Sequence, residues 1–216
     1  MKKAVLLIVM LVLSWGFLRA QENTASAGYM PHSYYTFSWN SIFPLGDFDK
    51  WVSQPSPAGF DIGGRYLIHK GLTAGFNIGW ERVAEIYGRQ TYTIPDLGIA
   101  ITAENYRFTW MTPFQAVIAY HFIPNKIISP YISLGIGGDY MEHHLLVQEY
   151  DIYKTYWDFS LTPEIGALIR FGVFSQWGAL VAFNYKWTTN KIDFYQTTSK
   201  DLQMLNLKIG LAFILR

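Results

Sequence analysis

Apolar and polar side chains alternate with a period of two along most of this chain. The clearest stretch is 72–81, where apolar residues at the even positions alternate with small or polar residues at the odd positions. Comparable alternation occurs at 35–40, 60–68, 105–122, 132–140, 157–171, 178–188 and 205–213. Because successive side chains of a strand point to opposite faces, this period indicates β-structure. The pattern therefore predicts eight β-strands.

The connections between these strands alternate between short and long. Short connections fall at 69–71, 123–129 and 172–176, and long ones at 41–58, 83–103, 141–156 and 189–201. Membrane-spanning barrels combine short turns at one end with long loops at the other, and an even strand number returns both termini to one side. The pattern predicts an up-and-down barrel with both termini at its short-turn, periplasmic end.

The polar face of the strands distinguishes a membrane barrel from a soluble one. This face is mostly Gly, Ser, Thr, Asn and Ala, whereas a soluble barrel exposes its polar face to water and needs many charges there. Small side chains suit the narrow interior of eight strands, and a closed barrel pairs every backbone donor and acceptor within hydrocarbon. We therefore predict an all-β, eight-stranded antiparallel up-and-down transmembrane β-barrel.

Aromatic residues gather near both ends of the predicted strands. Those expected near the long-loop end are Trp80, Tyr106, Phe108, Tyr140, Trp157 and Trp187. Those expected near the short-turn end are Tyr66, Tyr120, Phe122, Phe171, Trp177 and Phe213. Aromatic side chains prefer the depth of the lipid headgroups, so two such belts predict girdles at the two membrane interfaces. The general preference of aromatic residues for strands is the alternative explanation.

A few charged residues fall on the inward face. Counting along rising and falling strands places Glu164 and Lys208 near mid-height. Placed nearer the long-loop end are Arg107, Glu81, Asp139, Asp158 and Lys186, and nearer the middle or the short-turn end are Asp61, Arg65 and Arg170. A buried charge is costly unless it is paired, which predicts ion pairs across the lumen with Glu164–Lys208 as the best single candidate. We favour a network that plugs the lumen over a gate or proton-sensitive path, because eight strands leave little room.

The first twenty residues have the pattern of a secretory signal peptide. Lys2 and Lys3 precede an apolar run from 4 to 13, and Ala20 offers a cleavage position before Gln21. The alternative is an uncleaved anchor. We predict a signal peptide at 1–20 and one outer-membrane barrel domain at 21–216.

Two local features bear on the loops and the strand ladders. Pro113 and Pro163 fall inside predicted strands, where proline removes a ladder donor, so we expect a bulge or kink at each. The segment 145–153 is strand-like although it lies in a predicted long connection. It indicates a hairpin that protrudes above the membrane. We favour a role in shielding the barrel mouth over the alternative, the binding of a partner by strand addition along an exposed edge.

Three segments carry a resemblance to the small outer-membrane β-barrel family that includes OmpA- and OmpX-type domains. They are 130–137 (PYISLGIG), 163–166 (PEIG) and the closing 205–213 (LNLKIGLAF). The resemblance covers nearly all of the chain after the leader. It implies an outer-membrane location and outer-membrane lipid as a partner, with no specific activity.

The sequence provides little support for enzyme chemistry. No cysteine is present, and the net charge of +1 gives no indication of nucleic-acid binding. His143 and His144 are adjacent, so on a strand they point to opposite faces, and no nucleophile, base and orienting group fall together. We expect no enzyme activity, catalytic residues, cofactor or metal site. The favoured function is a structural or surface-interaction barrel with a protein partner at its extracellular loops. The alternatives are a narrow transport barrel for ions or small apolar molecules and, less favoured, a lipid-modifying enzyme.

Overall fold

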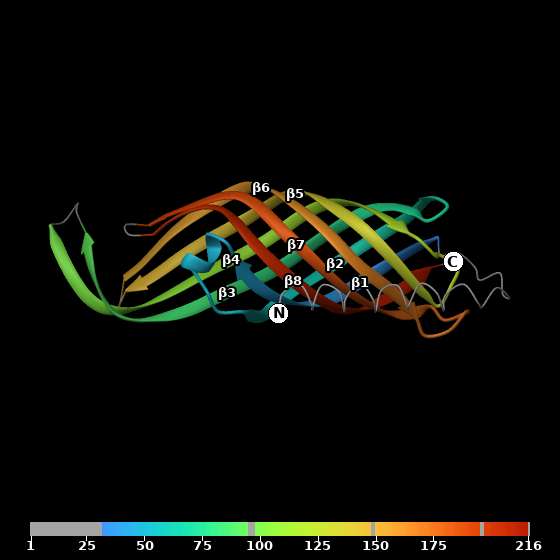
Figure 1. The fold of residues 1–216 in the computed structure, drawn as a ribbon, viewed down its shortest axis with the longest axis horizontal. Helices are drawn as coiled ribbons and strands as arrows, with labels where there is room; N and C mark the ends of the chain where they lie inside the picture. Colours follow the sequence, from blue (N-terminus) through green and yellow to red (C-terminus); the bar gives the residue numbers. More distant parts are fainter. Residues whose placement is uncertain (1–31, 95–97, 148–149, 195–196, 216) are drawn as a thin grey trace, which may run out of the picture.

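Eight antiparallel strands form one closed barrel in which β8 pairs with β1 (Figure 1). The computed structural model describes residues 32–94, 98–147, 150–194 and 197–215. The strands are β1 (Ser33–Leu45), β2 (Ser56–His69), β3 (Leu72–Ile94), β4 (Ile99–His121), β5 (Ile128–Val147), β6 (Tyr150–Arg170), β7 (Trp177–Phe194) and β8 (Thr197–Leu215). One 3-10 turn, η1 (Phe48–Lys50), lies between β1 and β2. The predicted fold class is confirmed, whereas the predicted leader at 1–20 lies outside the described residues.

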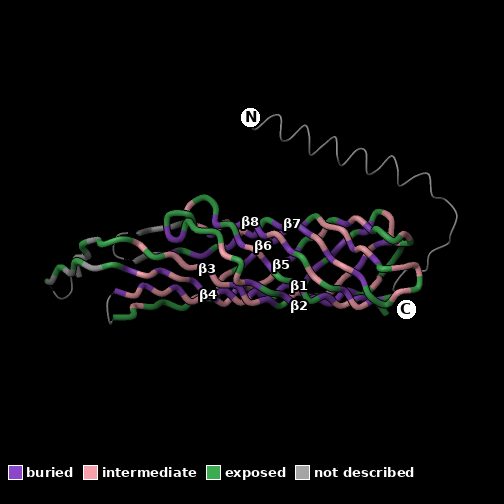
Figure 2. The backbone as a smooth tube through the Cα atoms, turned by 90° about the horizontal axis from the view of Figure 1, so that it is seen from below, coloured by how far each residue is buried: buried purple, intermediate pink, exposed green. Residues whose placement is uncertain are grey.

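The two faces of each strand are buried and exposed in turn, as Figure 2 shows along the tube. On β4, the side chains of Phe114 and Ile118 are 42% and 59% exposed, whereas those of Val117 and Ala119 are buried. The bulky apolar residues therefore face outward and the small or polar residues face the lumen. This is the orientation that the sequence pattern predicts, because lipid accepts large rings and a narrow lumen does not.

The predicted long loops are wrong in three of four places. The stretches 83–103, 141–156 and 189–201 mostly continue the ladders of β3–β4, β5–β6 and β7–β8 as protruding hairpins. The β3–β4 hairpin extends farthest from the barrel (Figure 1). In these hairpins the alternation of apolar and polar residues weakens, whereas backbone pairing continues. The hairpin expected at 145–153 is confirmed, since β5 ends at Val147 and β6 begins at Tyr150.

The bulges expected at the two prolines are also absent. The β3–β4 register is the same on both sides of Pro113, from Ile78↔Phe114 to Glu81↔Met111. Pro163 likewise pairs in unbroken register with Leu134 of β5. The ladder instead omits two residue pairs beside each proline, because a missing donor removes bonds on one side without inserting a residue.

The two ends of the barrel differ. The short turns and the two ends of the barrel sheet, Ser33 of β1 and Leu215 of β8, lie together at one end, where Ser33 pairs with Leu215. The protruding hairpins and η1 lie at the other end. Among the described residues, no helix is long and apolar enough to cross a membrane.

Candidate functional site

A lysine between two carboxylates lies near the middle of the lumen. The Nζ of Lys208 on β8 lies 2.5 Å from Oδ2 of Asp61 and 3.2 Å from Oε2 of Glu164. The Tyr131 hydroxyl donates a hydrogen bond of 2.8 Å to Glu164, and the Asn40 amide donates one of 3.3 Å to Asp61. The structure therefore brings together the pair singled out from sequence, Glu164 and Lys208, and adds Asp61 to it.

A second lysine has the same arrangement toward the hairpin end. The Nζ of Lys186 on β7 lies 3.0 Å from Oε2 of Glu81 and 2.7 Å from Oδ2 of Asp139. The Ser160 hydroxyl donates to Asp139 over 2.8 Å. All three charged side chains are at most 4% exposed. Removing one partner of a pair this deeply buried is strongly destabilising, because the other charge then stays buried and unpaired.

The three arginines of the predicted network do not join these lysine-centred groups through ion pairs. Arg65 donates to the Phe76 carbonyl and to the Asn77 side chain, and Arg170 donates to the Lys126 carbonyl in the β4–β5 turn. Arg107 lies near the hairpin end, with its guanidinium 4.2 Å from the Tyr87 ring centroid and 5.2 Å from that of Trp51. Counting in twos places these arginines on the inward face, where all three are buried, but it does not indicate their partners.

A small polar cavity separates the two lysine groups. It measures about 20 Å³, which is room for the centre of about one water molecule. Asp61 and Lys208 line it on one side and Glu81 and Lys186 on the other.

The β1–β2 connection folds into the mouth of the barrel. The side chains of Phe48, Trp51 and Val52 are fully buried there. They pack in an apolar cluster that also contains Ile42, Val83, Met111, Met141, Leu145, Val147, Ile192, Leu202 and Met204. We call this group the mouth cluster. The sequence showed only apolar residues inside a long connection, so nothing indicated that they point inward.

Polar contacts fix this connection in place. The Trp51 indole N–H donates to the Thr109 hydroxyl over 2.9 Å, and the Ser53 backbone N–H donates to Glu85 over 2.5 Å. A hydrogen bond from Lys50 and another from the backbone N–H of Lys200 lower the pKa of the Asp47 carboxyl. The connection is therefore attached to β3, β4 and β8.

A buried hydrogen-bonded histidine lies beside the mouth cluster. His143 accepts or donates at Nδ1 with the Thr109 hydroxyl over 2.8 Å and at Nε2 with Asn190 Oδ1 over 2.9 Å. Because Asn190 Oδ1 is an acceptor, Nε2 must carry the proton. His144 points outward instead, as its position predicts, and stacks on Phe108 with ring centroids 4.4 Å apart.

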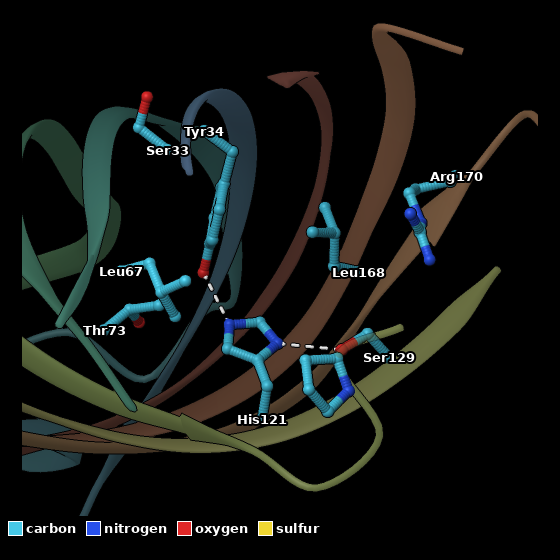
Figure 3. Close-up of a pocket in the computed structure, with 9 residues that line it drawn as sticks. Ser33, Tyr34, Leu67, Thr73, His121, Ser129, Leu168 and Arg170 are labelled. Carbon is cyan, nitrogen blue, oxygen red and sulfur yellow. Dashed lines mark hydrogen bonds between the residues drawn. The ribbon is translucent and has the colours of Figure 1, made fainter. Parts of the chain in front are cut away.

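A second pocket lies at the short-turn end of the lumen, and Figure 3 shows its lining. The ring of His121 lies between the Tyr34 hydroxyl, 3.0 Å from Nε2, and the Ser129 hydroxyl, 3.0 Å from Nδ1 (Figure 3). This places a serine beside a histidine, which sequence spacing did not indicate. The cavity is only about 20 Å³, and Ser129 is buried. Among the described residues, no group of three His, Asp or Glu side chains is placed to hold a metal ion.

The aromatic residues predicted as girdles face outward at two levels. On the hairpin side, β-sheet register aligns Trp80, Tyr140 and Trp157 in one row across β3, β5 and β6, with Thr112 of β4 between them. Tyr106 does not join this row, because it lies six residues beyond Thr112 on β4, roughly 20 Å along the strand. At the short-turn end, Trp177 pairs with Phe213, and their ring centroids are 5.1 Å apart. Tyr66, Tyr120 and Phe171 are 45–62% exposed near the same end, and Trp187 faces outward on β7.

The β6–β7 ladder ends below the aromatic row, three residues from Trp157 toward the short-turn end. The β6–β7 ladder ends at Ser160↔Thr188, although β6 continues to Tyr150 and β7 to Phe194. The Thr189 hydroxyl takes over the last position by accepting from the Phe159 backbone N–H over 3.2 Å. Beyond that point the described residues of β6 pair with β5 alone. We call the backbone groups of Asp151, Tyr153, Thr155 and Trp157 that point away from β5 the free edge of β6.

Solved structures of other proteins share this architecture. The Neisserial surface protein A, NspA, superposes with a TM-score of 0.51 over 86% of this chain and 98% of its own, at 11% identity. The chain has the fold of the small outer-membrane β-barrels. Ail, the attachment invasion locus protein of Yersinia pestis, superposes with a TM-score of 0.44 over 86% of this chain and 100% of its own, at 11% identity. Outer membrane protein AlkL superposes with a TM-score of 0.46 over 91% of this chain and 96% of its own, at 17% identity.

Comparisons at the level of sequence add nothing to the small-barrel assignment. No protein-family model matches the chain. No curated protein matches it either.

Proposed function

We propose that this small barrel resides in the outer membrane with its lumen plugged by side chains and binds an extended segment of another protein along the free edge of β6. The observation that carries the proposal is the end of the β6–β7 ladder at Ser160↔Thr188 while both strands continue. Both termini would then lie in the periplasm, and the protruding hairpins would lie outside the cell.

Two features support a plugged lumen. The lysine groups at Lys208 and Lys186 cross the interior at two heights, and the mouth cluster fills the hairpin end. The two cavities between and below them measure about 20 Å³ each. Such cavities hold about one water apiece, which argues for an interior that does not conduct.

The direction of the backbone groups supports strand addition on β6. The Phe159 N–H faces β7, and this direction alternates along a strand. The N–H and C=O groups of Asp151, Tyr153, Thr155 and Trp157 therefore face the open side. No described residue pairs with them. An edge of this kind is a template for an added strand.

The corresponding edge of β3 shows how this barrel protects an edge. There the β2 ladder ends at Gly59↔Glu81, and the β1–β2 connection covers the continuation. The Ser56 hydroxyl donates to the Arg82 carbonyl over 2.5 Å, and Ser53 bonds Glu85. Because one edge is covered and the other is not, the free edge of β6 is a candidate for recognition.

The chemistry at the β6 edge favours a basic partner. The ring of Tyr153, which is 64% exposed, stacks on His144, and His144 stacks on Phe108. At the other end of this stack, the Cζ atom of Arg82 lies 5.3 Å from the Phe108 ring centroid. The outer face of Tyr153 has no such cap. An arginine of an incoming strand would occupy it as Arg82 does, and the half-exposed carboxylate of Asp151, which lies 3.1 Å from Nδ1 of His144, would attract it.

A second copy of this chain does not fit the same edge. Two barrels in one membrane run their β6 strands in the same vertical direction. The strand tilt of roughly 35–45° in such barrels then crosses the two edges steeply, which prevents a shared ladder. The occupant is therefore an extended segment of a different protein.

Thr155→Pro tests the edge without disturbing the barrel. Its N–H faces the open side, so proline removes a free donor and no internal ladder bond. A heptapeptide of alternating Thr and Arg should protect the amides of Tyr153 and Trp157 from hydrogen exchange, measured by NMR in micelles. Thr155→Pro should abolish this protection, and Thr155→Val should keep it. Absence of protection in the parent chain, or equal protection by a Thr and Glu peptide, would contradict the proposed site.

The release of a small entrapped dye tests whether the lumen is plugged. The folded chain in liposomes should release an entrapped small dye no faster than protein-free vesicles. The reason is that, in the proposed plug, the two lysine groups block a continuous water path through the lumen. The charge-neutral variant that combines Lys186→Met, Glu81→Gln and Asp139→Asn removes the lysine group toward the hairpin end. It is the matched control. Robust release by the parent chain would support the transport alternative instead.

A further inference from the structure

One cation on the outward face of the barrel has no acidic partner. Arg82 follows Trp80 of the aromatic row by two residues on β3, roughly 7 Å farther along the strand. It lies outside the lumen, on the same face as Trp80. This position corresponds to the depth of lipid headgroups if the aromatic row marks the membrane interface.

Neighbouring aromatic side chains hold this guanidinium in a fixed position. Its Cζ lies 4.6 Å from the Trp110 centroid and 5.3 Å from the Phe108 centroid. One Nη2 N–H donates to the Tyr106 hydroxyl over 2.8 Å, while Nε is buried and has no hydrogen-bond partner. An arginine whose fork is already oriented loses little freedom when it binds a second group.

The carboxylate in the same row is kept away from Arg82. Register places Arg82 beside Trp110 and Trp110 beside Glu142, so the Trp110 strand position separates the two charges. Glu142 instead accepts from the Tyr140 hydroxyl over 2.7 Å and lies 3.7 Å from His144. No described carboxylate forms an ion pair with Arg82.

We infer that Arg82, framed by Trp110, Phe108 and Tyr106, binds the phosphate group of a lipid in the outer leaflet. Phosphate is the anion present at this depth of a membrane, and its oxygens match the guanidinium fork. The rings beside it contact the lipid below the headgroup. This inference rests on the proposed insertion in a membrane.

Native mass spectrometry of the full chain folded into micelles tests this site with two matched lipids. Dimyristoyl phosphatidate and dimyristoylglycerol share their acyl chains and differ in the phosphate. The parent chain should bind the phosphatidate at least about tenfold more tightly, the equivalent of one strong charge-assisted interaction. Arg82→Gln should remove this difference, and Arg82→Lys should keep only part of it because the fork is lost.

Arg89→Gln is the matched control, because it makes the same charge change on the same strand at an exposed position nearer the hairpin tip. It should bind phosphatidate as the parent chain does. Equal losses in the two variants, or equal binding of the two lipids, would overturn the site. Displacement of the lipid by excess inorganic phosphate would assign the site to free phosphate instead. Gel mobility without heating separates these results from a failure of the chain to fold into micelles.

Discussion

Replacing Lys208 with methionine should destabilise the barrel by about 3–5 kcal/mol, the usual effect of removing one partner from a buried ion pair. The change leaves the carboxylates of Asp61 and Glu164, 2.5 Å and 3.2 Å from the lost ammonium, facing each other in a closed lumen. Methionine fills most of the volume, so the effect comes from charge rather than from a cavity. Urea unfolding in lipid vesicles, followed by tryptophan fluorescence, measures it.

A compensated variant separates charge from packing. Lys208→Met combined with Asp61→Asn and Glu164→Gln removes all three charges and should recover most of the lost stability, because neutral replacements of buried ion pairs are often close to neutral in free energy. Raising the salt concentration should change the parent chain little, since buried pairs are weakly screened. A single variant as stable as the parent would show that Lys208 does not balance these carboxylates in the folded barrel.

Replacing Gly75 with alanine should destabilise the barrel by about 3 kcal/mol or more, because overpacking that moves backbone is among the costlier substitutions. A Cβ at this position would lie 1.8 Å from the Gly64 carbonyl oxygen and 2.9 Å from the Arg65 Cα. Both atoms belong to β2, so the β2–β3 ladder would have to separate. The same unfolding measurement, with gel mobility before heating, detects the loss.

Gly88 provides the matched control on the same strand. It lies in the protruding hairpin, where an added Cβ meets nothing within 4 Å. Gly88→Ala should leave stability unchanged to within about 0.5 kcal/mol, the usual range for surface substitutions. If both alanine variants lost stability equally in urea, the close approach of β2 and β3 at Gly75 would not explain the effect.

Some of the charged residues that line the lumen could be predicted from the sequence, because the alternation of side chains along a strand is a local property. The side of the strand on which Glu164, Lys208 and Lys186 lie follows from counting in twos. Approximate height follows from strand direction, which was enough to propose Glu164 with Lys208. The partners of the arginines could not be predicted, because Arg65 and Arg170 donate to backbone carbonyls, which every residue has.

The proposed binding edge of β6 and the inward-folded β1–β2 connection could not be predicted from the sequence in the same way. The ladder of β6 ends against β7 at Ser160 because the two strands diverge, and no residue type marks that point. Phe48 and Trp51 enter the lumen because the connection that carries them folds back over the mouth. The contact of Lys186 with Glu81 joins residues 105 positions apart, a distance over which only the barrel register decides proximity.

The sequence by itself determined the number of strands, their antiparallel order and which face of each points outward, because a narrow lumen and an apolar surrounding select opposite side chains at alternate positions. The tertiary structure alone decided how far the hairpins continue, which edge stays free and which charges touch. Those features depend on the stagger between strands and on backbone pairing in the hairpins, where backbone hydrogen bonds continue without a regular pattern of side chains.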